Sequence, residues 1–143
     1  ILQVAIEEVE SQTKTWSSTT LQPVVLVTPS ASGWSMVSAM VSNNDTGVWN
    51  EVPYYVEVWI PVAPVSMTRA TDEQIVGAVF SNNIPVLALY GADDSGGKKL
   101  SNRLGQVGQE VGGTVKVVEL DGGHAAYRRS PDAFVREILD FIS

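Results

Sequence analysis

The chain contains 143 residues, of which 44% are hydrophobic and 17% are charged, and its formal net charge is −7. This composition is typical of a globular protein with a sizeable core, so we expect a single domain over residues 1–143. The acidic balance argues against a surface for nucleic acid or for an anionic membrane. The chain has no cysteine and only one histidine, which excludes disulfides, thiolate metal sites, a cysteine nucleophile and a multi-histidine metal site.

No apolar run approaches the roughly 20 residues that a helix needs to cross a bilayer. Residues 1–10 carry three glutamates and lack the basic start of a secretory leader. We therefore expect an intracellular, cytoplasmic protein with no membrane partner. The chain begins at Ile1 instead of Met, and we expect that a segment upstream of it is absent.

The first half of the chain alternates predicted helices with predicted strands. Apolar residues at helical spacing predict a helix over residues 1–14. An unbroken apolar run predicts a strand buried on both faces over residues 23–27, and residues 28–33 have the composition of a turn. A short helix is expected over residues 34–41. The aromatic and β-branched residues of 55–62 then predict a second strand.

The second half continues the same alternation. Thr71 and Gln74 have the spacing of a capping box, and they predict the start of a helix that continues through Phe80. Two more apolar runs predict strands over residues 84–90 and 115–120.

Two further helices are predicted beside these last strands. The first has an apolar face and is ended by the glycine pair at 112–113. The second begins at Ser130 and Pro131, which are residue types preferred at the N-cap and in the first turn. The residues expected to face the core are Leu100, Leu104, Val107 and Val111 in the first helix, and Phe134, Ile138 and Phe141 in the second.

Strands that alternate with helices predict an α/β fold, with a parallel sheet and helices on both of its faces. In such sheets, functional groups collect on the loops beyond the carboxyl ends of the strands. Ser30 follows the first predicted strand. Asp93 and Asp94 follow the third, and His124 follows the fourth. The chain order is serine, acid, histidine, which is the order used by α/β-hydrolases.

These residue types together predict nucleophilic catalysis. An imidazole can remove the proton from a serine hydroxyl during attack and return it to the leaving group. A carboxylate fixes the tautomer of the imidazole and stabilises the cation that forms. We therefore predict a catalytic triad that needs neither a metal nor a cofactor, with the backbone N–H of Ala31 as an oxyanion donor.

Each of these residues also has an ordinary structural explanation. Residues 28–32 depart at both glycine positions from the Gly-x-Ser-x-Gly pattern of a nucleophile elbow. Asp93 and Asp94 fit a turn, where aspartate is common. Trp34 and Tyr127 are candidates to line a substrate pocket, but packing explains each of them at least as well. The prediction of a triad therefore depends on three residues falling on three particular loops in one order.

Several segments resemble the hydrolase-domain-14 group of small serine hydrolases, within the α/β-hydrolase superfamily. Residues 23–33 (PVVLVTPSASG) resemble the Ser-Pro-Ser-x-Ser-Gly elbow that this group carries in place of Gly-x-Ser-x-Gly. The likeness continues through residues 59–64 (WIPVAP), 84–94 (IPVLALYGADD) and 122–142 (GGHAAYRRSPDAFVREILDFI). The resemblance implies Ser30 as the nucleophile, Asp94 as the acid and His124 as the base. It also implies a lidless hydrolase of small acyl esters, or an enzyme that transfers short acyl groups.

In the complete α/β-hydrolase fold, further strands precede the strand that carries the nucleophile. We therefore expect this chain to be the C-terminal half of such a fold, lacking the N-terminal strands. An N-terminal half or a partner chain is expected to complete the sheet beside residues 24–27, because an unpaired apolar edge would be prone to aggregation. Two functions remain open from the sequence: a serine esterase or acyl hydrolase, and a non-catalytic hydrolase-fold subunit of a larger assembly.

Overall fold

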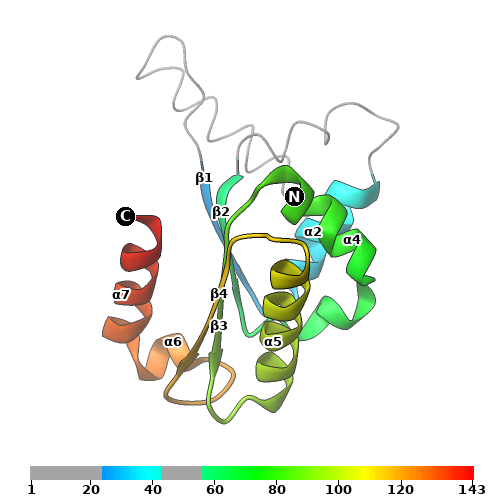
Figure 1. The fold of residues 1–143 in the computed structure, drawn as a ribbon. Coiled ribbons are helices and arrows are strands. Elements are labelled where there is room, and N and C mark those ends of the chain that lie inside the picture. The colour runs from blue at the N-terminus through cyan, green and yellow to red at the C-terminus, as the bar shows by residue number, and fades with distance from the viewer. Residues whose placement is uncertain (1–23, 43–55) are drawn as a thin grey trace, which may run out of the picture.

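A computed structural model describes residues 24–42 and 56–143, which form an α/β structure around one sheet (Figure 1). The sheet has four strands in the order β1-β2-β3-β4, and each neighbouring pair is parallel. The prediction of a parallel sheet is thereby confirmed, whereas the helix predicted over residues 1–14 lies outside the described residues. The strands are β1 (Val24–Pro29), β2 (Val56–Val62), β3 (Val86–Gly91) and β4 (Val115–Leu120).

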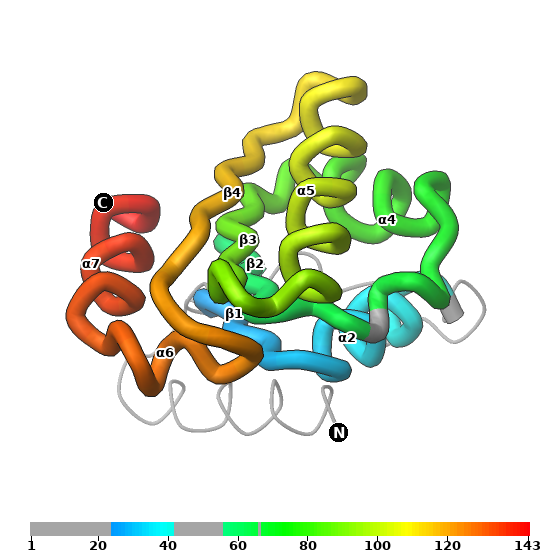
Figure 2. The backbone as a smooth tube through the Cα atoms, turned by 90° about the horizontal axis from the view of Figure 1, so that it is seen from below, coloured from blue at the N-terminus to red at the C-terminus, as the bar shows by residue number. Residues whose placement is uncertain are grey.

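Helices cover both faces of the sheet, as predicted, and Figure 2 shows the two layers on either side of it. One layer contains α2 (Ser32–Ser42), α4 (Asp72–Ala78) and α5 (Ser95–Glu110). The other layer contains α6 (Ala126–Arg129) and α7 (Pro131–Ile142). Two 3-10 helices, η2 (Val65–Arg69) and η3 (Phe80–Asn82), flank α4. None of the helices in the described residues combines the length and the apolar character needed to cross a membrane.

The core lies on both faces of the sheet because successive side chains of a strand point to opposite sides. On β2, Trp59 belongs to the cluster beneath α2, α4 and α5, while Val58 and Ile60 belong to the cluster beneath α6 and α7. Every residue of β3 is buried, which explains why its sequence is an unbroken apolar run. The residues of α7 that were predicted to face the core pack against the second cluster: Phe134, Ile138 and Phe141.

β1 and β4 are the edge strands of the sheet formed by the described residues. Val27 of β1 keeps 42% of its surface exposed, although its register partner Ile60 on β2 is fully buried. On the opposite layer, α7 exposes three apolar side chains, Val135, Leu139 and Ile142. That another polypeptide segment pairs with β1 remains a prediction.

The capping box predicted at the start of α4 is confirmed. The Thr71 hydroxyl accepts a hydrogen bond from the backbone N–H of Gln74 at 3.2 Å, and the Gln74 side-chain oxygen accepts one from the Thr71 backbone at 3.0 Å. The helix nevertheless ends at Ala78, earlier than predicted. The chain tightens into η3 at Phe80 and then turns at Asn83, whose φ is 55°.

Two side chains near helix ends differ from their sequence prediction. Val111 was expected to face the core but is 49% exposed, because α5 ends at Glu110 and Val111 is its C-cap. Ser130 occupies the N-cap position of α7 without capping the helix through its side chain. Its hydroxyl instead donates to the carbonyl oxygen of Asp121 at 3.3 Å.

Candidate active site

Ser30 occupies a tight turn between β1 and α2. The strand ends at Pro29 and the helix begins at Ser32, so the chain changes from strand to helix within two residues. Ser30 has a φ of 51°, a left-handed conformation that costs a residue with a side chain about 1–3 kcal/mol. Its backbone N–H donates to the carbonyl oxygen of Val62 at 2.8 Å, which fixes the turn to the end of β2. Strain of this kind is common at functional sites.

A buried polar contact supports the turn from beneath. The indole N–H of Trp59 donates to the Thr28 hydroxyl at 2.8 Å, and both residues are buried. Gly33, in the first turn of α2, lies against these two residues and Met67, whose atoms are 3.4 to 3.6 Å from where a Cβ would stand. Thr28, Gly33 and Trp59 fall in segments that the sequence singles out, but the sequence alone does not reveal the contacts among them.

Asp94 follows β3 and is the N-cap of α5. Its Oδ1 accepts a hydrogen bond from the backbone N–H of Gly97 at 2.9 Å. Burial raises the pKa of the Asp94 carboxyl group, but hydrogen bonds from Gly97 and His124 outweigh that effect and hold the pKa below the ordinary aspartate value. The side chain is only 10% exposed, and its low pKa keeps it ionised at neutral pH.

His124 contacts both of the other predicted triad residues. Its Nδ1 lies 2.8 Å from Oδ2 of Asp94, and its Nε2 lies 3.1 Å from Oγ of Ser30. The residue lies on the loop between β4 and α6, and 51% of its side chain is exposed. The fold thus brings together three side chains from three loops at one end of the sheet.

Geometry distinguishes the two neighbouring aspartates, which the residues alone do not. Asp94 faces His124, whereas Asp93 is exposed. The backbone N–H of Asp93 donates to the carbonyl oxygen of Gly122 at 2.9 Å. Asp93 therefore ties the loop after β3 to the loop after β4 through its backbone.

The hydrogen-bond chain through His124 has a defined direction. An ionised Asp94 can only accept, so Nδ1 of the imidazole carries a proton and donates it. Nε2 of the neutral ring is then without a proton and accepts from the Ser30 hydroxyl. The imidazole is placed to take the hydroxyl proton, and the carboxylate is placed to stabilise the cation that results.

The other residues predicted for the site are Ala31, Trp34 and Tyr127, and they differ in their surroundings. Ala31 lies in the turn directly after Ser30, as an oxyanion donor must. Trp34 is half-buried on α2 and packs against the core cluster on that face. The ring of Tyr127 packs against that of Phe134, with centroids 6.0 Å apart, and the Arg128 guanidinium lies 5.8 Å from its centre. Both aromatic residues make packing contacts, and their role in a substrate pocket remains a prediction.

No protein-family model, curated protein or solved structure matches this chain. Within residues 24–42 and 56–143, no group of three or more histidine, aspartate and glutamate side chains is arranged to hold a metal ion. The function must therefore be inferred from the side chains that the fold brings together.

Proposed function

We propose that the protein is a serine hydrolase that cleaves small acyl esters through Ser30, His124 and Asp94. The observation that carries the proposal is the continuous chain of contacts from the Ser30 hydroxyl to His124 and on to Asp94, at 3.1 and 2.8 Å. These residues lie beyond the carboxyl ends of parallel strands, where α/β proteins collect functional groups. The left-handed backbone of Ser30 is an independent support, because strained residues concentrate at functional sites.

In the proposed reaction, the Ser30 oxygen attacks the ester carbonyl while Nε2 of His124 takes the hydroxyl proton. The tetrahedral intermediate collapses when His124 returns that proton to the leaving alcohol, and the acyl group stays on Ser30. The same imidazole then takes a proton from water, which attacks the acyl group, and returns that proton to the Ser30 oxygen as the acid leaves. Asp94 stays ionised throughout and stabilises the imidazolium.

The negative charge that develops on the carbonyl oxygen requires hydrogen-bond donors placed in advance. We assign one of them to the backbone N–H of Ala31, which directly follows the nucleophile. The start of α2 at Ser32 lies beside it, and the N-terminus of a helix favours negative charge.

A small acyl ester suits the exposed position of the imidazole. About half of the His124 side chain is exposed, so solvent and small substrates reach the imidazole directly. The resemblance to the hydrolase-domain-14 group supports the same substrate class, because its members are compact and lidless. Transfer of a short acyl group would use the same acyl-serine, with another acceptor in place of water.

A second candidate function is that of a non-catalytic subunit that binds another chain. It is favoured by the apolar exposure of Val27 on the edge strand β1 and of three side chains on α7, between 42% and 55%. Exposed strand edges and apolar patches are typical of surfaces that pair with a partner. A binding subunit, however, has no need for the alignment of Ser30, His124 and Asp94.

The test is an intact-mass measurement of the full-length protein after exposure to a fluorophosphonate, which forms a bond only with an activated serine. We expect a single adduct on the wild-type protein and none on Ser30→Ala. Ser32→Ala is the matched control, because Ser32 is an exposed serine at the start of α2 and its hydroxyl donates to the carbonyl oxygen of Pro29 at 2.6 Å. Absence of an adduct on the folded wild-type protein would contradict the hydrolase and leave the binding subunit.

A further inference from the structure

The segment that follows β2, residues 63–70, lies between the turns that carry Ser30 and Asp94. We call it the β2 exit segment. The last residue of β2 accepts the backbone N–H of Ser30 at 2.8 Å, so the segment starts at the nucleophile turn. Ala63 then passes close to the acid turn, because a Cβ on Gly97 would stand 3.2 Å from the Ala63 Cα.

Side chains of the β2 exit segment also contact the helices that follow the Ser30 turn and the Asp94 turn. Met67 is 1% exposed, and its sulfur lies 3.6 Å from where a Cβ of Gly33 would stand, at the start of α2. A Cβ on Gly96, at the start of α5, would stand 3.7 Å from Cγ1 of Val65. Ala63 has a φ of 48°, which is strained for a residue other than glycine. The segment therefore separates the helix after the nucleophile from the helix after the acid.

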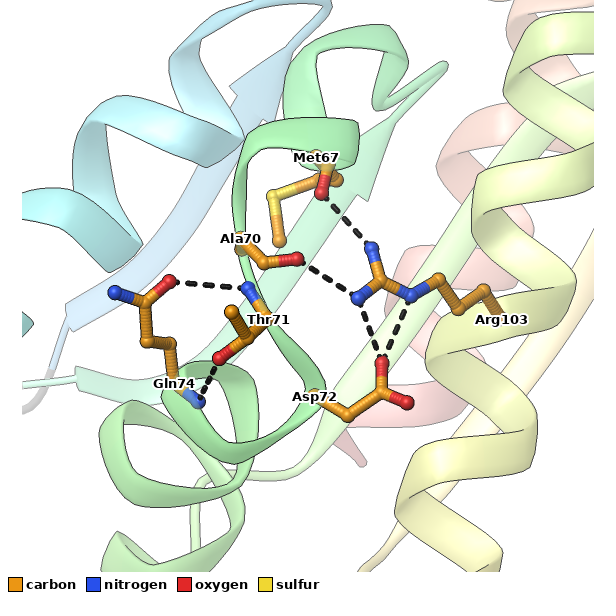
Figure 3. A network of polar contacts seen from close by, with 6 residues as sticks. All are labelled: Met67, Ala70, Thr71, Asp72, Gln74 and Arg103. Atoms are coloured by element: carbon orange, nitrogen blue, oxygen red, sulfur yellow. Dashed lines mark hydrogen bonds and ion pairs between the residues drawn. The ribbon is translucent and has the colours of Figure 1, made fainter.

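Arg103 of α5 binds the far end of the β2 exit segment, as Figure 3 shows. Its Nη1 donates to the carbonyl oxygen of Met67 at 3.0 Å, and its Nη2 donates to that of Ala70 at 2.8 Å. Nε and Nη2 also donate to Oδ1 of Asp72, at 2.9 and 2.6 Å. One side chain thus binds two backbone carbonyls and a carboxylate.

These contacts depend on the shape of the guanidinium group. A 3-10 helix such as η2 ends in carbonyl groups that its own backbone does not fully satisfy. The planar guanidinium presents several N–H groups in fixed directions, which an ammonium group does not. Asp72 is 59% exposed, so the ion pair itself contributes little. The hydrogen bonds to the carbonyls of Met67 and Ala70 are therefore what holds the segment.

We propose that Arg103 is a positioning residue of the active site, which fixes the spacing between the Ser30 turn and the Asp94 turn through the β2 exit segment. This inference rests on the proposed function. His124 must reach both side chains at once, so a small shift of either turn lengthens one of its two contacts. Loss of Arg103 should lower kcat with little change in KM, because its contacts are with the protein backbone and Asp72.

The experiment compares Arg103→Met and Arg103→Lys with the wild-type full-length protein. Arg69→Met is the matched control, because it removes the same charge from an exposed position at the end of η2. The kinetic measurement is kcat and KM for a short-chain ester. The second measurement is the NMR signal of the imidazole proton that His124 shares with Asp94.

We expect Arg103→Met to lower kcat by about 10- to 100-fold and to broaden the imidazole proton signal. The kcat and the imidazole proton signal of Arg103→Lys should lie between those of Arg103→Met and the wild type. Lysine keeps the charge but lacks the planar set of N–H donors of the guanidinium group. A wild-type kcat and a wild-type signal in Arg103→Met would overturn the inference, as would an equal loss in Arg69→Met. If Arg103→Met does not fold, Arg103→Lys decides by the same measurements. An inactive wild-type protein would overturn the proposed hydrolase. The NMR signal does not depend on turnover, so it would still test the role of Arg103 in that case.

Discussion

The backbone of Gly91 lies directly against the carbonyl oxygen of Gly123, with no space for a Cβ atom between them. Gly91 is the last residue of β3, and Gly123 immediately precedes His124. The carbonyl carbon of Gly122 is 2.8 Å from the same Cβ position. The loop that bears the histidine therefore rests on the end of the strand that leads to Asp94, and only glycine permits this approach.

We predict that Gly91→Ala displaces the His124 loop and lowers both stability and Ser30 labelling. The added methyl group would overlap backbone atoms, which cannot rotate away, so we expect a loss of about 1–3 kcal/mol in the free energy of unfolding. Denaturant unfolding measures this loss, and the rate of fluorophosphonate labelling measures the effect on the site. Gly77→Ala is the control, because a Cβ there meets nothing within 4 Å. Wild-type stability and labelling in Gly91→Ala would contradict the prediction.

A second glycine substitution tests the position of the acid. A Cβ on Gly97 would stand 2.6 Å from Oδ2 of Asp94, the oxygen that contacts His124. We predict that Gly97→Ala slows fluorophosphonate labelling by about tenfold or more, because it pushes the carboxylate out of line. Gly96→Ala is the neighbouring control, since its Cβ would make ordinary contacts at 3.6 and 3.7 Å. Similar labelling rates in the two variants would show that the site tolerates movement of the carboxylate.

The pH dependence of stability follows from the low pKa of Asp94. Burial opposes ionisation of this group, but hydrogen bonds from Gly97 and His124 hold its folded pKa below the ordinary 3.8. A carboxyl group with a depressed folded pKa stabilises the fold above its unfolded pKa, and that stability is lost as pH falls through the folded pKa. We predict that the stability advantage of wild type over Asp94→Asn is present at neutral pH and declines as the pH falls from 3.8 through the lower folded pKa.

Urea unfolding over a series of acidic pH values measures that advantage. Asp93→Asn is the control, because it removes a carboxylate from the exposed neighbour and leaves the contact with His124 in place. A stability difference between wild type and Asp94→Asn that stays constant with pH would mean that the carboxylate is not stabilised by its partners.

The sequence is most informative where burial and strand order decide the outcome. The apolar run over residues 84–90 predicts a strand, and every residue of β3 is buried. Residues 23–27 form the run that was predicted to be buried on both faces. That prediction is wrong for β1, which is an edge strand of the sheet formed by the described residues and is only partly buried. The same alternation of elements places Ser30, Asp94 and His124 beyond strand ends before any contact is known.

Contacts between side chains and backbone atoms leave no comparable pattern in the sequence. Arg103 is an ordinary polar residue of a helix by sequence, and its binding to two carbonyls depends on where η2 ends. Gly91 and Gly97 fall in a stretch whose composition indicates only a turn, yet each allows a close approach within the site. Val111 continues the apolar spacing of α5 but is exposed, because spacing does not reveal where a helix ends.

The last prediction concerns the hydrogen bond beneath the nucleophile turn. Thr28→Val keeps the shape and the β-branching of the side chain but removes the acceptor of the Trp59 indole N–H, which is buried. An unsatisfied buried donor costs about 1–3 kcal/mol, so we expect a loss of that size in the free energy of unfolding. Thr28→Ser is the control, because it keeps the hydroxyl and loses one methyl group. If unfolding shows Thr28→Val to be as stable as Thr28→Ser, the hydrogen bond does not support the turn, and packing around Gly33 must hold Ser30 in its left-handed conformation.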